Sequence, residues 1–332
     1  MADTIHDTGS LRKILNLLAD GQFHSGEELG LLLGVSRAAV WKHVQKLEGL
    51  GIQLSSIKGK GYCIDGGLDL LDIGKIESYR ESDVPLVVSV FPQIDSTNSY
   101  LMRHENPVGQ VCMAESQTAG RGRRGRQWVS PFAQNIYCSC GWGFEGGVAV
   151  LEGLSLVVGL VIVRSLQRHG ISGLKLKWPN DVLYQNQKLA GILIEMRGDP
   201  AGYCEVVIGV GINVSMADEQ AQSITQPWID LRTIVELQEL EPVSRNRVAG
   251  TLLDELASML SSYEQKGFAC YRSEWESMNA HAGKRVELHN GTLVHAGAYV
   301  GVTDVGALIL ETAQGREEFH GGELSLRSGY DS

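Results

Sequence analysis

The sequence lacks any apolar run long enough to cross a membrane. A transmembrane helix needs roughly 20 consecutive apolar residues, and runs such as Leu154–Val163 are about half that length. The first ten residues have neither the basic nor the apolar region of a signal peptide. We therefore expect a cytoplasmic protein without a membrane partner.

The cysteine and histidine spacings of metal and redox sites are also missing. The six cysteines, at positions 63, 112, 138, 140, 204 and 270, form no CxxC pair and are too few for a disulfide scaffold. Cys138 and Cys140 alternate along one expected strand, where we interpret them as buried free thiols. The nine histidines show neither H-x₃-H nor HExxH spacing, so we expect no metal site built by the protein itself.

Charge is unevenly distributed along the chain. The net charge is −10, but residues 1–65 carry five Lys and two Arg against four Asp and three Glu. All of the excess negative charge therefore lies in residues 66–332. A neutral first fifth on an otherwise acidic protein indicates that the two parts have separate functions. With 43% hydrophobic and 20% charged residues, we expect a folded chain with one large core and one or two small ones.

Residues 120–128 (GRGRRGRQW) combine three glycines with four arginines and no acidic residue. Glycine allows close backbone approach, and arginine adds a permanent charge that binds phosphate or carboxylate. The segment matches GxGxxG, but it does not lead into a helix as a dinucleotide-binding turn does, and it lacks the Lys-Ser/Thr ending of a P-loop. A disordered RNA-binding tract is the alternative. Apolar segments on both sides favour an ordered loop that binds a phosphate-bearing ligand.

The first 65 residues predict three short helices and a hairpin. Apolar residues recur at helical spacing over 11–18, and Ser25-Gly-Glu-Glu28 is a capping box that opens a helix to position 33. After a turn at Gly34, Ser36 caps a third helix to about position 49 or 51. Residues 52–64 read as two strands joined by a turn at 58–61, the layout of a wing.

A short helix, a tight turn and a Ser-capped basic helix form the helix-turn-helix pattern, whose last helix enters the DNA major groove. The DNA-binding residues that we predict are Ser36, Arg37, Lys42, Lys46, Lys58 and Lys60. The alternative is a winged helix used only for protein contacts. A neutral module contacts few phosphates, so specific binding would need two modules presented together.

The remainder of the chain predicts an α/β body and a small β domain. Strands are expected at 85–91, 111–115, 134–142, 188–195 and 203–212, and helices at 150–169 and 244–267, the latter extended by 271–278. Asp95-Ser-Thr-Asn98 suits a helix N-cap or the head of a polar ligand. From 284 the pattern changes to short strands at 286–288, 296–302 and 307–311, which suggests an SH3-like barrel.

Five motifs carry a resemblance to a known family. They are STN (96–98), QTAGRGRRGRQW (117–128), KWPND (177–181), KLAGILIE (188–195) and GVGIN (209–213). In this order and spacing the chain resembles the biotin protein ligases, and its N-terminal module is similar to that of the bifunctional ligases that also repress the biotin operon. The resemblance implies a winged helix-turn-helix domain (1–65), a class II synthetase-like catalytic domain with a mixed sheet (66–280) and an SH3-like domain (281–332).

The resemblance also implies the chemistry and its residues. Such a ligase joins biotin to AMP from ATP, with Mg²⁺ carried by the nucleotide, and transfers biotin to a lysine of the biotin carboxyl carrier protein of acetyl-CoA carboxylase. The residues that would bind biotin and biotinyl-AMP are Ser96, Thr97, Asn98, Gln117, Gly120, Arg121, Gly122, Arg123 and Lys188. The catalytic residues would be Lys188, Arg123 and Asp181. Those at the nucleotide would be Trp228, Asn213 and Arg327.

Simpler interpretations remain open for several of these residues. Asp181 could deprotonate the incoming lysine or merely cap a turn, and Trp228 could pack on adenine or lie in the core. Lys177 and Arg327 could approach the phosphates or remain on the surface, and Lys188 could be a solvated residue at a strand end.

The resemblance predicts that biotinyl-AMP is also the corepressor, which would favour a homodimer that presents two winged helices to the biotin operator DNA. The alternatives are a monomeric ligase, a ligase whose winged helix no longer binds DNA, a lipoate or octanoate ligase, and a ligand-sensing transcription factor without enzymatic activity.

Overall fold

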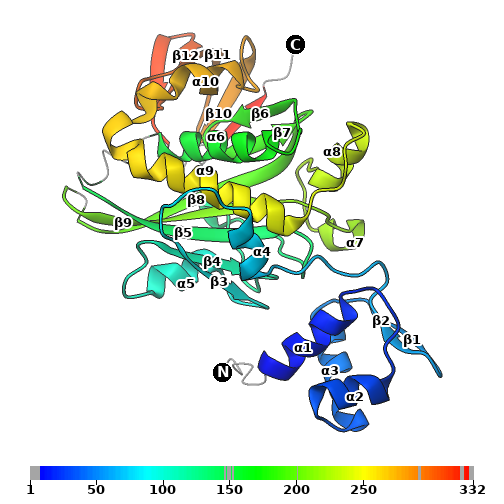
Figure 1. The fold of residues 1–332 in the computed structure, drawn as a ribbon. Coiled ribbons are helices and arrows are strands. Elements are labelled where there is room, and N and C mark those ends of the chain that lie inside the picture. The colour runs from blue at the N-terminus through cyan, green and yellow to red at the C-terminus, as the bar shows by residue number, and fades with distance from the viewer. Residues whose placement is uncertain are drawn as a thin grey trace.

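The N-terminal part contains the predicted helices and wing. The computed structural model describes residues 8–145, 147, 151, 153–199, 201–290, 293–321 and 325–328. The N-terminal elements are α1 (Thr8–Leu18), α2 (Gly26–Leu33), α3 (Arg37–Gly49), β1 (Ser55–Ile57) and β2 (Gly61–Cys63) (Figure 1). The expected helix caps are present: Ser25 Oγ accepts the Glu28 N–H at 3.0 Å, and Ser36 Oγ accepts the Ala39 N–H at 3.3 Å. Gly34 ends α2 in the left-handed conformation (φ +67°).

A small apolar core stabilises this part and joins it to the rest of the molecule. Leu18, Val40 and Leu47 are completely buried in it. The same cluster includes Phe132 and Ala133, which follow the glycine-arginine segment in the sequence. The winged helix therefore packs against the chain that leaves that segment.

A buried ion pair anchors the linker that follows the wing. Gly66 and Gly67 both have positive φ, as a turn requires. Downstream, the Leu71 N–H donates to Glu115 Oε1 at 2.6 Å, and Arg245 Nη2 donates to Glu115 Oε2 at 2.8 Å. Both charged side chains are buried, so each needs the other.

A seven-stranded mixed sheet forms the body of the protein, in the order β3-β4-β5-β9-β8-β7-β6. The strands are β3 (Val87–Phe91), β4 (Gln110–Ala114), β5 (Ile136–Phe144), β6 (Leu174–Lys177), β7 (Asp181–Tyr184), β8 (Gln187–Gly198) and β9 (Cys204–Ile212). Only the pair β3–β4 is parallel among these neighbours. The mixed sheet implied by the family resemblance is confirmed.

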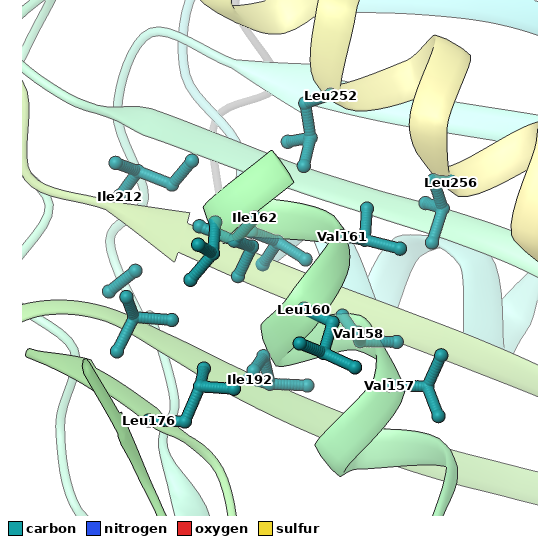
Figure 2. Close-up of a cluster of buried hydrophobic side chains, with 14 of the residues drawn as sticks. Val157, Val158, Leu160, Val161, Ile162, Leu176, Ile192, Ile212, Leu252 and Leu256 are labelled. Atoms are coloured by element: carbon teal, nitrogen blue, oxygen red, sulfur yellow. The ribbon is translucent and has the colours of Figure 1, made fainter. Parts of the chain in front are cut away.

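Helices cover both faces of this sheet. On one face α6 (Leu154–Gln167) and α9 (Arg245–Lys266) pack over the strands, and Figure 2 shows apolar side chains from both helices meeting those of β6, β8 and β9. The other face carries α5 (Thr97–Arg103), whose Leu101 packs on Cys112. Cys138 and Cys140 are buried free thiols in the core beneath α6 and α9, as predicted.

Further helices connect these layers, and one prediction about them is wrong. They are α4 (Ile73–Ser78), α7 (Asp218–Ala221), α8 (Leu231–Leu237), α10 (Arg272–Ser277) and the 3₁₀ turns Arg123–Gly125 and Phe268–Cys270. Residues 271–278 do not extend the long helix. Gly267 ends α9 with φ +58°, and a 3₁₀ turn separates it from α10. Among the described residues no helix is long and apolar enough to cross a membrane.

The C-terminal part is a five-stranded antiparallel sheet in the order β13-β12-β11-β10-β14. Its strands are β10 (Arg285–Asn290), β11 (Leu293–Val302), β12 (Leu308–Thr312), β13 (Gly315–Phe319) and β14 (Ser325–Ser328). The sequence reading missed the last two. This part supports the KWPND segment, because the buried Trp178 donates its indole N–H to the Gly306 carbonyl at 3.0 Å.

Candidate active site

A cavity of about 1000 Å³, its open mouth included, lies where α5, the glycine-arginine loop, the KWPND segment, β8 and β9 meet. Six cationic side chains and one carboxylate line it. The cations are Arg121, Arg123, Arg124, Arg126, Lys177 and Lys188, and the carboxylate is Asp181. Such an excess of positive charge favours an anionic ligand.

The floor of the cavity is a set of buried polar groups at the start of α5. Ser96 caps this helix, with Oγ 3.4 Å from the Ser99 nitrogen. Gln117 Oε1 accepts the Thr97 N–H at 2.8 Å, and Gln117 Nε2 donates to Ser130 Oγ at 3.1 Å. Asn98 donates from Nδ2 to Glu195 Oε2 at 2.9 Å. These contacts hold the polar atoms of the STN segment in fixed positions for a ligand head.

The glycine-arginine loop has a defined backbone, as its flanking strands predict. The Trp128 N–H bonds to the Gly120 carbonyl at 2.9 Å, and the Gly122 N–H to the Arg126 carbonyl at 2.7 Å. Between these closures Arg124 and Gly125 have φ of 60° and 69°. The Arg126 N–H bonds to the Arg123 carbonyl at 3.3 Å across these two residues, so they form a tight turn at the tip of the loop.

Two arginines of this loop bond to strands and segments outside it. Arg121 Nη2 donates to Glu195 Oε2 at 3.1 Å, and Arg123 Nη1 donates to Asn180 Oδ1 at 3.2 Å. Burial lowers the pKa of the Arg123 guanidinium below its usual value. A guanidinium that is partly withdrawn from water interacts more strongly with an anion that enters beside it.

Trp128 forms one wall of the cavity against two glycines. Gly191 on β8 and Gly211 on β9 are cross-strand partners. A Cβ at Gly211 would lie 2.5 Å from Trp128 Cε2, and one at Gly191 would lie 3.0 Å from Cζ3. The indole therefore lies directly on backbone, which only glycine at both positions permits.

Lys188 faces both this tryptophan and the carboxylate of the cavity. Its Nζ is 2.7 Å from Asp181 Oδ1 and 5.4 Å from the centre of the Trp128 ring. The contact with Asp181 is a short ion pair between two side chains that are both mostly buried. Because Asp181 begins β7 and pairs with Lys188, it is not simply a turn cap. A charge pair at the edge of a cationic cavity can exchange partners with an entering carboxylate or phosphate.

Comparison with known proteins agrees with this geometry. Family models match the chain as an HTH domain (10–63), the Biotin/lipoate A/B protein ligase family (90–213) and the Biotin protein ligase C terminal domain (281–327). The bifunctional ligase/repressor BirA of Salmonella typhimurium is 41% identical over 97% of this chain and 99% of that protein. The Escherichia coli BirA is also 41% identical, over 95% and 97% respectively. The chain belongs to the biotin protein ligase family.

A solved structure supports the same conclusion. The Aquifex aeolicus biotin protein ligase, in complex with biotin and ATP, aligns with a TM-score of 0.62 at 29% identity, over 73% of this chain and 99% of that one. Because the similarity to BirA includes the HTH domain, the ligase is of the bifunctional ligase/repressor type. The family identified from the five sequence motifs is thereby confirmed.

The structure brings most of the predicted site residues of the ligase together. Those that line the cavity are Ser96, Thr97, Asn98, Gln117, Arg121, Gly122, Arg123, Asp181 and Lys188. Gly120, the first residue of the loop, is not among the lining residues. A Cβ at this position would lie 2.5 Å from the Trp128 carbonyl oxygen. Among the residues with described positions, no group of three or more His, Cys, Asp or Glu is placed to hold a metal ion.

The residues predicted at the nucleotide are not among those that line the cavity. Asn213 Nδ2 donates at 3.2 Å to the carbonyls of Lys188 and Ile229, so it fastens one segment to another. Trp228 is half-buried beside Lys188 and is not a core residue. Arg327 lies on β14 opposite Glu287, but its side chain is outside the described residues.

Four residues that contribute to the site were not predicted from the sequence: Trp128, Ser139, Asn180 and Glu195. Each of them contacts a predicted site residue or lines the cavity. Strand alternation contained a signal for one, because Ser139 lies between two cysteines that face the core and so faces α5. The others depend on contacts between distant segments.

The predicted DNA-binding residues are all on one small module. Arg37, Lys42 and Lys46 are exposed along α3, and Ser36 caps that helix. Lys58 and Lys60 are exposed in the turn of the wing. Lys60 also lies 5.9 Å from the centre of the Phe23 ring.

Proposed function

We propose that this ligase makes biotinyl-5′-AMP from biotin and Mg-ATP and transfers biotin to a lysine of a biotin carboxyl carrier protein, in acetyl-CoA carboxylase. One observation carries the proposal: a cationic cavity whose floor is a neutral, buried set of hydrogen-bonding groups. Biotin has a polar ring system at one end and a carboxylate at the other, and this cavity has both environments.

Biotin fits with its ring head on the floor and its chain along the tryptophan wall. Thr97 and Gln117 offer polar atoms to the head, and Trp128 lies along the path toward Lys188. The biotin carboxylate would then reach Lys188 and Arg123, with ATP phosphates along the glycine-arginine loop. We assign the catalytic body to residues 66–280, between a DNA-binding domain at 1–65 and the C-terminal domain at 281–332.

In the first step a biotin carboxylate oxygen attacks the α-phosphorus of ATP and pyrophosphate leaves. Negative charge accumulates where two anions meet, and fixed cations stabilise it there. Lys188 leaves Asp181 and binds the reacting oxygens instead, and Arg123 is held by Asn180, the residue before Asp181. Both cations are held before the substrates arrive, so little reorganisation is needed.

In the second step the neutral amine of the carrier lysine attacks the biotinyl carbonyl and AMP leaves. Once Lys188 binds the phosphate, Asp181 is free to accept a proton from that amine. We further propose that Trp228, Asn213 and Arg327 shape the nucleotide end. Support comes from Gln226 and Leu326, which line the cavity and lie within two residues of Trp228 and Arg327.

The donors of the cavity fit Mg²⁺ only when it arrives with the nucleotide. Asp181 is the one carboxylate among the lining residues, and Lys188 neutralises it. Mg²⁺ usually takes several of its oxygen ligands from substrate phosphates and water, and it would neutralise phosphate charge here.

We propose that the winged helix represses biotin-synthesis genes when biotinyl-AMP is bound, as a homodimer on operator DNA in the cytoplasm. The loop that binds the adenylate continues into Phe132 and Ala133, which pack in the winged-helix core. Ligand binding at the loop can therefore alter how the two modules are presented.

The test is a mobility-shift assay on DNA upstream of biotin-synthesis genes, with Mg-ATP present and biotin added or withheld. We expect a shift that depends on biotin and is lost in Lys188→Ala. Lys175→Ala, an exposed strand lysine, is the matched control and should behave as the wild type. Absence of a shift from protein that still biotinylates a carrier would refute the repressor mechanism and leave the ligase.

A further inference from the structure

Ser139 lies directly behind the floor of the cavity but does not line it. It is on β5 with its side chain fully buried. Its Oγ is 2.7 Å from Thr97 Oγ1 and 2.6 Å from Asn98 Oδ1. These two short contacts link the Ser139 hydroxyl to two neighbouring residues that line the cavity.

The amide of Asn98 has a fixed orientation. Its Nδ2 is 2.9 Å from Glu195 Oε2 and 3.2 Å from the Leu193 carbonyl, and both of these oxygens only accept. Arg121 holds the Glu195 carboxylate from the other side at 3.1 Å. The carbonyl oxygen of Asn98 must therefore face Ser139.

Counting protons then determines the orientation of the Thr97 hydroxyl. Ser139 has one hydroxyl proton, and Asn98 Oδ1 has none, so the contact between them requires the Ser139 proton. The contact between the two hydroxyl oxygens must then use the Thr97 proton. As a result, that proton points away from Gln117 Oε1, which lies 3.2 Å from Thr97 Oγ1.

We propose that Ser139 is a positioning residue which, with Glu195 behind Asn98, keeps Thr97 Oγ1 and Gln117 Oε1 as paired acceptors for ligand N–H groups. The site thereby selects a ring with N–H donors, as in a cyclic urea, over an acyl chain without them. This inference rests on the proposed function and deepens it.

The proposal has a specific consequence for selectivity. A fatty acid such as octanoate supplies no N–H, so its binding leaves the open lone pairs of Thr97 Oγ1 and Gln117 Oε1 without a donor from the ligand. Without the Ser139 hydroxyl, the Thr97 hydroxyl proton can turn to Gln117 Oε1, which already accepts the Thr97 backbone N–H, and occupy its second lone pair. Removing Ser139 should therefore weaken biotin binding and reduce the penalty against octanoate.

The experiment measures biotin-dependent pyrophosphate release by the full chain, with octanoate as a competitor. In Ser139→Ala we expect KM for biotin to rise about tenfold, with kcat and KM for ATP changed by less than about twofold. The ratio of the octanoate inhibition constant to KM for biotin should fall about tenfold.

Ser165→Ala is the matched control, because Ser165 is also fully buried and its Oγ lies 3.0 Å from another hydroxyl, Thr251 Oγ1. It should lose similar stability with unchanged KM for biotin. An unchanged KM in Ser139→Ala, or equal increases for biotin and ATP, would overturn the proposal.

A second variant covers the case in which Ser139→Ala does not fold. Ser139→Cys keeps a weaker proton donor, so KM for biotin should take an intermediate value, and an unchanged KM would again overturn the proposal. If the wild type itself releases no pyrophosphate with biotin, the proposed function fails instead. The two failures are therefore distinguishable.

Discussion

Gly211→Ala tests whether the contact of Trp128 with bare backbone positions the catalytic groups. The new Cβ would lie 2.5 Å from Trp128 Cε2 and 2.6 Å from Cζ2. Carbon atoms prefer a separation of about 3.5 Å or more, so the indole must retreat by about 1 Å. The rigid ring cannot bend away, and β9 is held between β5 and β8.

This movement should affect catalysis more than folding. Trp128 contacts Lys188 and closes the glycine-arginine loop, so both shift with it. A misplacement of about 1 Å can lower a rate by about 10²-fold, so we expect kcat/KM for biotin to fall about ten- to hundredfold. Overpacking should lower the free energy of unfolding by only about 1–3 kcal/mol.

The assay is pyrophosphate release against biotin concentration, together with thermal unfolding of the same preparations. Gly49→Ala is the control, because a Cβ there meets no atom within 4 Å. If Gly211→Ala retained wild-type kcat/KM, the tryptophan wall would have no role in positioning Lys188, and our reasoning about this site would be wrong.

Three further predictions concern stability. Trp178→Phe removes the donor to the Gly306 carbonyl, so calorimetry should show a loss of about 1–2 kcal/mol. Glu115→Gln leaves the buried Arg245 without its charge partner, and urea unfolding should show a loss of about 3 kcal/mol or more. Burial, with Lys side chains nearby, lowers the pKa of His281 to about 4, below its unfolded value of about 6.5. The unfolded state therefore binds more protons between these values, and stability should fall as the pH drops from 6.5 to 4. His281→Phe should have a shallower decline; an unchanged slope would contradict this assignment.

Local patterns in the sequence predicted most of the secondary structure and several of the residues that line the cavity. The capping box at Ser25, the cap at Ser36 and the helical spacing of leucines act over a few residues, and the structure has them where they were predicted. The loop of glycines and arginines and the order of the five motifs indicated the family, which the comparisons confirm.

Two strands and one helix boundary could not be predicted because their sequence patterns are weak or conflicting. The strand β13 (GREEF) is largely charged, and β14 lies close to the chain end. The break between α9 and α10 depends on Gly267, whose backbone freedom competes with a continuing helical pattern.

The sequence by itself determined which chemical groups this protein has: a winged helix, a cationic loop, a strand that contains Lys188 and a carboxylate at Asp181. Only the tertiary structure decided which of them meet. Ser139, Glu195 and Asn98 come from three different segments, and their proton arrangement depends on distances that no local pattern encodes. The pair Gly191 and Gly211 likewise matters because strand register places both beneath one indole. Register and packing are properties of the whole chain, and for that reason they became visible only in the folded molecule.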